Sequence, residues 1–119
     1  MANTFKVITV AGTTSQATVY TVGSSTTTVV LGVMLGNTTT SQVTATVTLS
    51  SDTSSRPPSG TNSGNNADVE LVTNAPIPAG STLEVMQGNK IILNADDRIK
   101  VDCSIADKVS VILSYMEIA

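Results

Sequence analysis

The chain has 119 residues, a net charge of −3, charged side chains at only 13% of positions and aromatic ones at 3%. A chain of this length forms one domain, and its acidic balance excludes the basic face that nucleic-acid-binding proteins use. The absence of histidine removes the commonest general base, the usual partner of a catalytic serine or cysteine and the usual zinc ligand, which argues against most hydrolases.

Short apolar or alternating segments, bounded by Gly, Asn, Asp, Ser and Pro, follow one another along the chain, whereas helical spacing of apolar residues is almost absent. This pattern predicts a single all-β domain over residues 1–119, an antiparallel β-sandwich of about eight or nine short strands with jelly-roll or immunoglobulin-like topology. In chain order, the expected strands are Thr4–Val10, Ala17–Val22, Thr28–Leu35, Val43–Ser50, Asp68–Thr73, Ser81–Met86, Lys90–Asn94, Arg98–Cys103 and Lys108–Glu117.

The tetrapeptide Thr-Thr-Ser-Gln occurs twice, at residues 13–16 and 39–42. Each copy follows an apolar run with a Gly and precedes a run in which apolar residues alternate with threonine. A few polar residues in that position favour a hairpin. We therefore expect two equivalent hairpin loops at the same end of the sheet.

The alternation also assigns faces, because successive side chains of a strand point to opposite sides of the sheet. In the segments 43–50 and 98–103, the apolar residues should enter the core and the intervening polar residues should face water. Cys103 shares the inward phase, which predicts a small buried hydrophobe and not a nucleophile. The inward residues are then Val43, Ala45, Val47, Leu49, Ile99, Val101 and Cys103, and the outward ones are Thr44, Thr46, Thr48, Arg98, Lys100 and Asp102.

Two strands, those expected at 28–35 and 108–117, are apolar on both faces. Met34, Ile112 and Met116 fall on the face that should be wet. Either a neighbouring loop or the second sheet covers these side chains, or another subunit does. The second alternative predicts a homo-oligomer, with a trimer favoured, or docking on a larger protein surface.

Residues 51–67 have no apolar periodicity and are rich in Ser, Gly, Asn and Pro, which predicts a long exposed loop. Such a loop is either functional or a tolerated insertion. If it is functional, Arg56, Asn62 and Asn65 are candidate contact residues, together with Phe5 of the N-terminal segment.

The carboxylates that could act in acid–base or metal chemistry are Asp96, Asp97, Asp102 and Asp107. Asp96 and Asp97 lie in Asn-Ala-Asp-Asp-Arg between two apolar strands, where Asn and Asp favour a turn. The spacing lacks the Gly and the terminal Glu of a calcium loop. We therefore expect a turn, with calcium binding and catalysis as weaker alternatives, and we expect no catalytic residue, no metal and no other cofactor.

The longest apolar stretch, Val29–Leu35, is far shorter than the ~20 residues that span a bilayer, so no membrane partner is expected. The start, MANTFKVITV, lacks the basic-then-apolar order of a secretion signal, which favours synthesis in the cytoplasm.

Residues 75–118 combine Pro-Ile-Pro-Ala-Gly-Ser, Leu-Glu, a Gly-x-Lys-Ile turn, a short apolar strand, an acidic turn, Ile-x-Val and a closing strand. Residues 27–49 add an apolar strand, Asn-Thr and a Thr-rich strand. This layout resembles small virion structural proteins of tailed bacteriophages and covers most of the chain. Where the resemblance leads us to expect Ala-Gly-Asp in the acidic turn, the chain has Ala95, Asp96 and Asp97.

The resemblance implies a non-enzymatic structural protein that is made in the host cytoplasm and incorporated in the virion. A capsid decoration, or cement, protein is favoured, with the major capsid protein or other virion proteins as partners. The alternative is a neck, tail, baseplate or fibre-attachment component. A carbohydrate-binding β-sandwich is a weaker hypothesis, because the chain has no Trp, two Tyr and one Phe for stacking on sugars.

Overall fold

A computed structural model describes residues 3–51 and 68–119, and within them every regular element is a β-strand. The nine predicted strands are all present, β4 and β8 with the predicted bounds. They are β1 (Asn3–Ala11), β2 (Ala17–Thr21), β3 (Thr27–Asn37), β4 (Val43–Ser50), β5 (Val69–Ile77), β6 (Thr82–Glu84), β7 (Ile91–Leu93), β8 (Arg98–Cys103) and β9 (Val109–Ile118).

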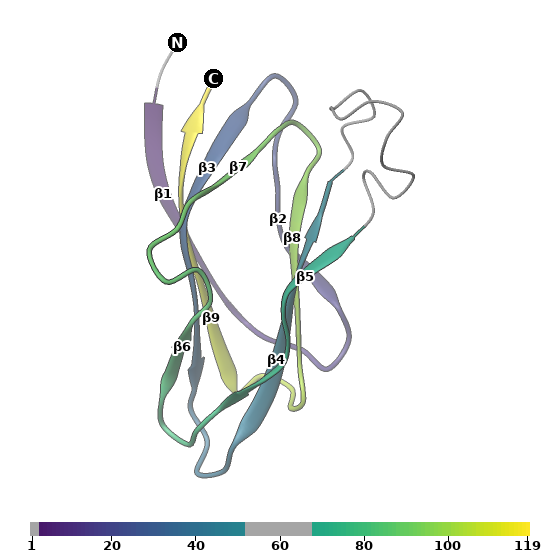
Figure 1. Cartoon of the computed structure of the whole chain (residues 1–119), viewed down its shortest axis with the longest axis vertical. Helices are drawn as coiled ribbons and strands as arrows, with labels where there is room; N and C mark the ends of the chain where they lie inside the picture. Colours follow the sequence, from purple (N-terminus) through teal and green to yellow (C-terminus); the bar gives the residue numbers. More distant parts are fainter. Residues whose placement is uncertain (1–2, 52–67) are drawn as a thin grey trace.

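The strands form two antiparallel sheets that pack face to face (Figure 1). The five-stranded sheet has the order β1-β9-β3-β6, and β7 pairs with β3 next to β6. The four-stranded sheet has the order β2-β8-β4-β5. The first and last strands are neighbours, so the two chain ends lie close together at one end of the sandwich (Figure 1). The predicted β-sandwich is confirmed.

Strand pairing is nested: β1 pairs with β9, β2 with β8, β3 with β6 and β7, and β4 with β5. This is the pattern of one long antiparallel hairpin rolled into two sheets. Apart from β4–β5 and β6–β7, each connection passes from one sheet to the other. The arrangement is that of a jelly roll, and not the immunoglobulin-like alternative.

The two Thr-Thr-Ser-Gln loops are equivalent, but they are not hairpins. Since β1 and β3 both lie antiparallel to β9, they run in the same direction and their loops leave the same end of the sheet, as predicted. Each loop then crosses to the other sheet, into β2 and β4. The hairpin prediction is wrong because packed sheets are only about 10 Å apart, a gap that a few residues can span.

The buried side chain of Asn37 fixes the second of these loops. Its Nδ2 group donates to the carbonyl oxygens of Ser41 at 2.7 Å, Ile77 at 2.9 Å and Pro78 at 3.2 Å. Its Oδ1 atom accepts from the main-chain N–H of Thr39 at 2.9 Å and from the Thr39 hydroxyl at 2.8 Å. One amide therefore ties the end of β3 to the following loop and to the end of β5.

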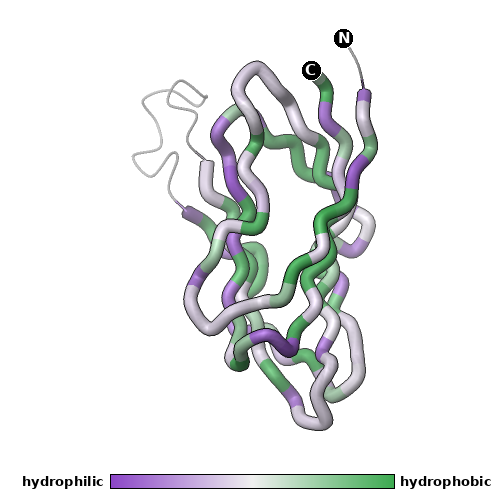
Figure 2. Tube along the Cα trace, turned by 180° about the vertical axis from the view of Figure 1, so that it is seen from behind, coloured by the Kyte–Doolittle hydropathy of each residue, from purple (hydrophilic) through white to green (hydrophobic). Residues whose placement is uncertain are grey.

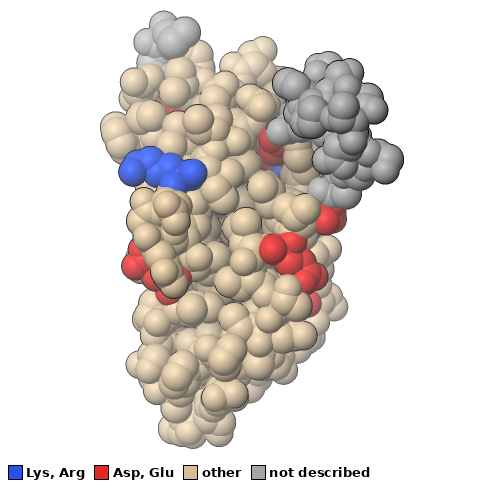
Figure 3. Space-filling view, in the orientation of Figure 1, with Lys and Arg blue, Asp and Glu red and all other residues tan. Residues whose placement is uncertain are grey.

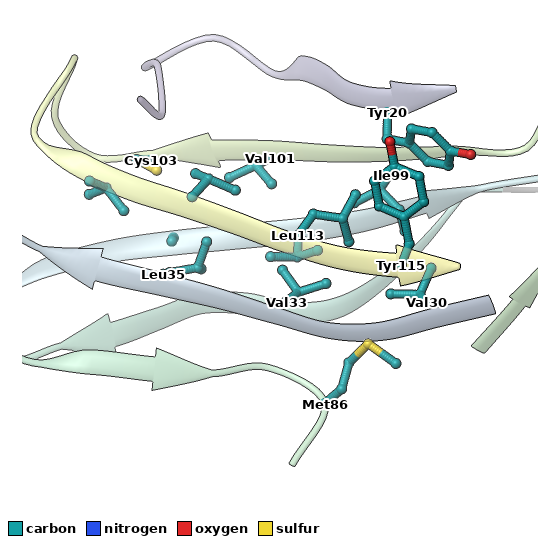
Figure 4. Close-up of a cluster of buried hydrophobic side chains, with 14 of the residues drawn as sticks. Tyr20, Val30, Val33, Leu35, Met86, Ile99, Val101, Cys103, Leu113 and Tyr115 are labelled. Atoms are coloured by element: carbon teal, nitrogen blue, oxygen red, sulfur yellow. The ribbon is translucent and has the colours of Figure 1, made fainter. Parts of the chain in front are cut away.

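The core is aliphatic apart from two tyrosines whose ring centroids lie 4.5 Å apart, Tyr20 and Tyr115. Figure 2 shows hydrophobic residues concentrated in the strands, and Figure 4 shows side chains of β3, β8 and β9 meeting in the interior. The inward predictions for β4 and β8 are confirmed, with Leu49 packed at the margin of the core. The buried hydrophobic residues are Tyr20, Val22, Val30, Val33, Leu35, Val43, Ala45, Val47, Ile77, Met86, Leu93, Ile99, Val101, Cys103, Val109, Val111, Leu113 and Tyr115.

The expectation of a wet threonine face on β4 is wrong for two residues. Thr46 is only 8% exposed and Thr48 only 3%. The Thr46 hydroxyl accepts a hydrogen bond from the main-chain N–H of Asn74 at 2.9 Å, and Gln16 Nε2 donates to the Thr48 hydroxyl at 3.2 Å. Both threonines point outward as predicted, but polar neighbours cover them.

The side chain of Cys103 also explains why residue 12 is a glycine. A Cβ atom on Gly12 would lie 2.5 Å from the Cys103 sulfur, far inside van der Waals contact, and 3.7 Å from Cys103 Cβ, an ordinary distance. The close approach brings the end of β1 against β8.

We predict that Gly12→Ala destabilises the protein by roughly 1–3 kcal/mol through overpacking. In a Cys103→Ala background the added methyl group meets no sulfur, so Gly12→Ala should cost at least about 1 kcal/mol less. Urea unfolding of the four proteins in this double-mutant cycle measures both costs. Equal costs in the two backgrounds would contradict the clash.

Candidate interaction surface

The outward side of the five-stranded sheet carries a row of apolar side chains across four strands. Phe5 of β1 lies opposite Met116 of β9, Met116 opposite Val29 of β3, and Val29 opposite Ile92 of β7. Residues that pair across antiparallel strands project from the same side of the sheet. The row is therefore continuous from one edge of the sheet to the other.

A second row runs parallel to the first. Thr9 lies opposite Ile112, Ile112 opposite Met34, and Met34 opposite Glu84 of β6. We call the whole surface the outer face. It is defined by Phe5, Val7, Thr9, Ala11, Val29, Met34, Glu84, Ile92, Ser110, Ile112, Ser114, Met116 and Ile118.

The outer face is open and nearly uncharged. Phe5 is 70% exposed, Ile92 65% and Val7 60%. Met34 and Met116, in the central strands, are half-buried. Glu84 is the only charged residue in the set, and the molecular surface seen in Figure 3 likewise carries few charged groups.

Four of the predicted contact residues are brought together on this face: Met34, Ile112, Met116 and Phe5. The four-stranded sheet packs against the opposite side of the five-stranded sheet, and none of the outer-face residues is fully buried by the described parts of the chain. The second sheet therefore does not cover them. The other candidates, Arg56, Asn62 and Asn65, lie outside the described residues, as does nearly all of the predicted loop at 51–67.

Sequence reasoning missed the other residues of this face, among them the apolar side chains of Val7, Val29 and Ile92. Val7 has the same phase as Phe5 within one strand, so alternation could have identified it. Ile92 joins the face because β7 pairs with β3, and a single sequence does not reveal which strands pair.

A depression lies at one end of the β1–β9 pair. This shallow depression has a volume of about 450 Å³ and is lined by Thr9, Val10, Ala11, Ser110, Val111 and Ile112. None of the lining side chains is an acid, a base or a nucleophilic thiol. Its polar side chains are the hydroxyls of Thr9 and Ser110, and the rest of its lining is apolar.

The acidic candidates lie at separate places in the fold. Asp96, with a φ of 71°, and Asp97 occupy the turn before β8, whereas Asp107 follows β8 at the opposite end of the sandwich. Buried Asp97 accepts hydrogen bonds from the main-chain N–H of Asn94 at 3.0 Å and from the Ser51 hydroxyl at 3.1 Å. The turn role is confirmed, and no group of three or more metal-ligating side chains occurs among the described residues.

Cys103 is buried, as predicted from its phase. Burial, with a smaller effect from the charge of Asp102, raises the pKa of the Cys103 thiol. A buried thiol that holds its proton is a poor nucleophile.

A polar cluster closes the sandwich at the end where the termini lie. The Tyr20 hydroxyl, from β2, donates to Glu117 of β9 at 2.7 Å and shares a 2.7 Å hydrogen bond with Thr28 of β3. Lys6 of β1 forms an ion pair with the same carboxylate at 2.8 Å. Hydrogen bonds from Lys6 and Tyr20 hold the pKa of Glu117 below its ordinary value, and the bond to Glu117 raises the pKa of Lys6.

Comparisons of the chain with protein-family models, with curated proteins and with solved structures find no match. No helix that could cross a membrane occurs in residues 3–51 and 68–119.

The Glu117 cluster predicts a pH dependence of stability. Because the folded-state pKa of Glu117 is lowered, its contribution is complete above the unfolded-state pKa and is lost as the pH falls through the folded-state value. We predict that stability falls below about pH 4.3, and that Glu117→Gln flattens this fall. Urea midpoints measured against pH test this, with Glu84→Gln, outside the cluster, as the control. The same acid slope in Glu117→Gln and the unmodified protein would contradict the assignment.

Proposed function

We propose that the chain is a non-enzymatic structural protein of a bacteriophage particle, which decorates the capsid by docking its outer face on the major capsid protein. The observation that carries this proposal is the outer face itself, an open apolar surface across four strands with Glu84 as its charged residue. Exposed contiguous apolar surfaces of this kind mark protein contacts. The resemblance of residues 75–118 to phage virion proteins is the reason for proposing a bacteriophage particle as the binding partner.

The outer face is suited to binding through the burial of apolar surface. Burying an exposed side chain of this size contributes roughly 1.5–3 kcal/mol when burial is complete, less for residues that are already half-covered. Association costs consume part of this gain. With few charges in the contact, docking depends little on salt, because screening weakens only charged interactions.

A catalytic role has little support in the chain. It has no histidine, and its buried carboxylate, Asp97, is bonded within a turn. A sugar-binding role also has little support, because few aromatic side chains are available to stack on a sugar: Tyr20 and Tyr115 are buried and Trp is absent. Jelly rolls occur in both viral capsid and lectin domains, so the fold alone does not choose between them.

The proposal predicts that Ile92→Glu weakens binding to capsids that lack the protein by at least about tenfold, because the contact would bury an unpaired charge. Ile92 is 65% exposed, so its replacement leaves the fold intact. The matched control is Ile105→Glu, at an exposed position in the loop before β9. Co-sedimentation with capsids measures both affinities, and equal binding by the two variants would contradict docking through the outer face.

The position on the particle is tested separately. Immunogold labelling of purified particles should place the protein over the shell, and particles without it should lose DNA at a lower temperature. Label confined to the neck, tail or baseplate would overturn the decoration role and favour the alternative location.

A further inference from the structure

β1 is an unpaired sheet edge that carries one charged side chain, Lys6. It pairs with β9 in one continuous register over nine residues, and no described strand pairs with its other side. It contains neither Gly nor Pro, and Phe5, Val7 and Val10 are exposed along it. A long, regular and apolar edge is a template for another strand.

The other sheet edges in the described chain each carry a feature that opposes strand addition. β2 has only five residues and a register shift between Thr18 and Tyr20. β5 has two register shifts, Pro76 and a left-handed Asn74 with a φ of 45°. β6 and β7 have three residues each. Natural proteins protect their edges with such bulges, prolines and short strands, and β1 has none of them.

The direction of the main-chain groups of β1 follows from the hydrogen bond after its last residue. Gly12 N–H donates to the carbonyl oxygen of Val109 at 2.8 Å, and the register continues this pairing along β9. Residues of an antiparallel strand alternate in the side to which their N–H and C=O groups point. The main-chain groups of Phe5, Val7 and Thr9 therefore point to the open edge.

We propose that a second copy of this chain adds its own β1 to this edge, antiparallel, across a two-fold axis at Val7. This register overlaps the whole of both strands and forms about ten main-chain hydrogen bonds. Phe5 then lies opposite Thr9 of the second copy. Lys6 lies opposite Ile8 of the second copy and not opposite another Lys6, and its charge is already paired with Glu117 at 2.8 Å in its own chain.

The two-fold axis is perpendicular to the sheet, so both outer faces lie on the same side of the joined sheet. Two copies would then present one apolar surface of twice the area. A closed ring of three would instead require β1 to pair with a different edge, and the other edges are protected. The proposal thus favours a dimer over the trimer expected from the sequence, and it does not depend on the phage role.

The first test is Val7→Lys, which places two like charges opposite each other at the axis and should raise the dimer dissociation constant at least about tenfold. Val7 is 60% exposed, so the subunit should still fold. The matched control is Val69→Lys, at a 51% exposed valine on an edge of the other sheet, which should leave the dimer intact. Sedimentation equilibrium measures the association.

The second test uses cysteines at two positions of β1, since Cys103 is buried. Val7→Cys should form an intermolecular disulfide, because paired residues at the axis have Cα atoms about 5.5 Å apart. Thr9→Cys should not, because the two copies of residue 9 would be about 14 Å apart. A monomer, a trimer, or equal cross-linking at residues 7 and 9 would overturn the proposal.

Discussion

β9 lies between β1 and β3, and this central pairing sets which side chains of the five-stranded sheet enter the core and which point outward. Inward-pointing Leu113 and Tyr115 meet the four-stranded sheet, whereas Ile112 and Met116 take the other phase. Because β9 is apolar in both phases, closing the core necessarily leaves a second apolar surface on the outside. The same strand that stabilises the fold thus creates the candidate interaction surface.

Polar groups tie the two sheets together at both ends of this aliphatic core. At one end, the Tyr20 hydroxyl of the four-stranded sheet binds Glu117 of the other sheet. At the opposite end, the Asn37 amide joins β3 to the end of β5. Buried polar groups stabilise a fold only when their hydrogen bonds are made, and these are. They restrain the relative position of the sheets, so the outer face is a rigid surface that needs little ordering on binding.

The strands and their inward phases could be predicted from the sequence, because alternation depends on local geometry alone. The burial of Val47 and Val101, for example, follows from their place in the alternating pattern of their own strands. The choice of strand partner could not be predicted, since period-two patterning is the same for a hairpin and for a crossover between sheets. For that reason the loops before β2 and β4 were predicted as hairpins, and Ile92 was missed. Thr48 is buried although it points outward, and it accepts a hydrogen bond from Gln16, which is distant in sequence; no local pattern reveals this contact.

The central claim, that the outer face is a contact surface, can be tested through methionine oxidation, which follows solvent exposure. Met34 and Met116 lie half-exposed on the outer face, whereas Met86 is buried in the core and serves as an internal reference. In the free protein, brief peroxide treatment read by mass spectrometry should oxidise Met34 and Met116 faster than Met86. On purified particles, both should slow to near the rate of Met86. Unchanged oxidation of Met34 and Met116 on the particle would contradict the account.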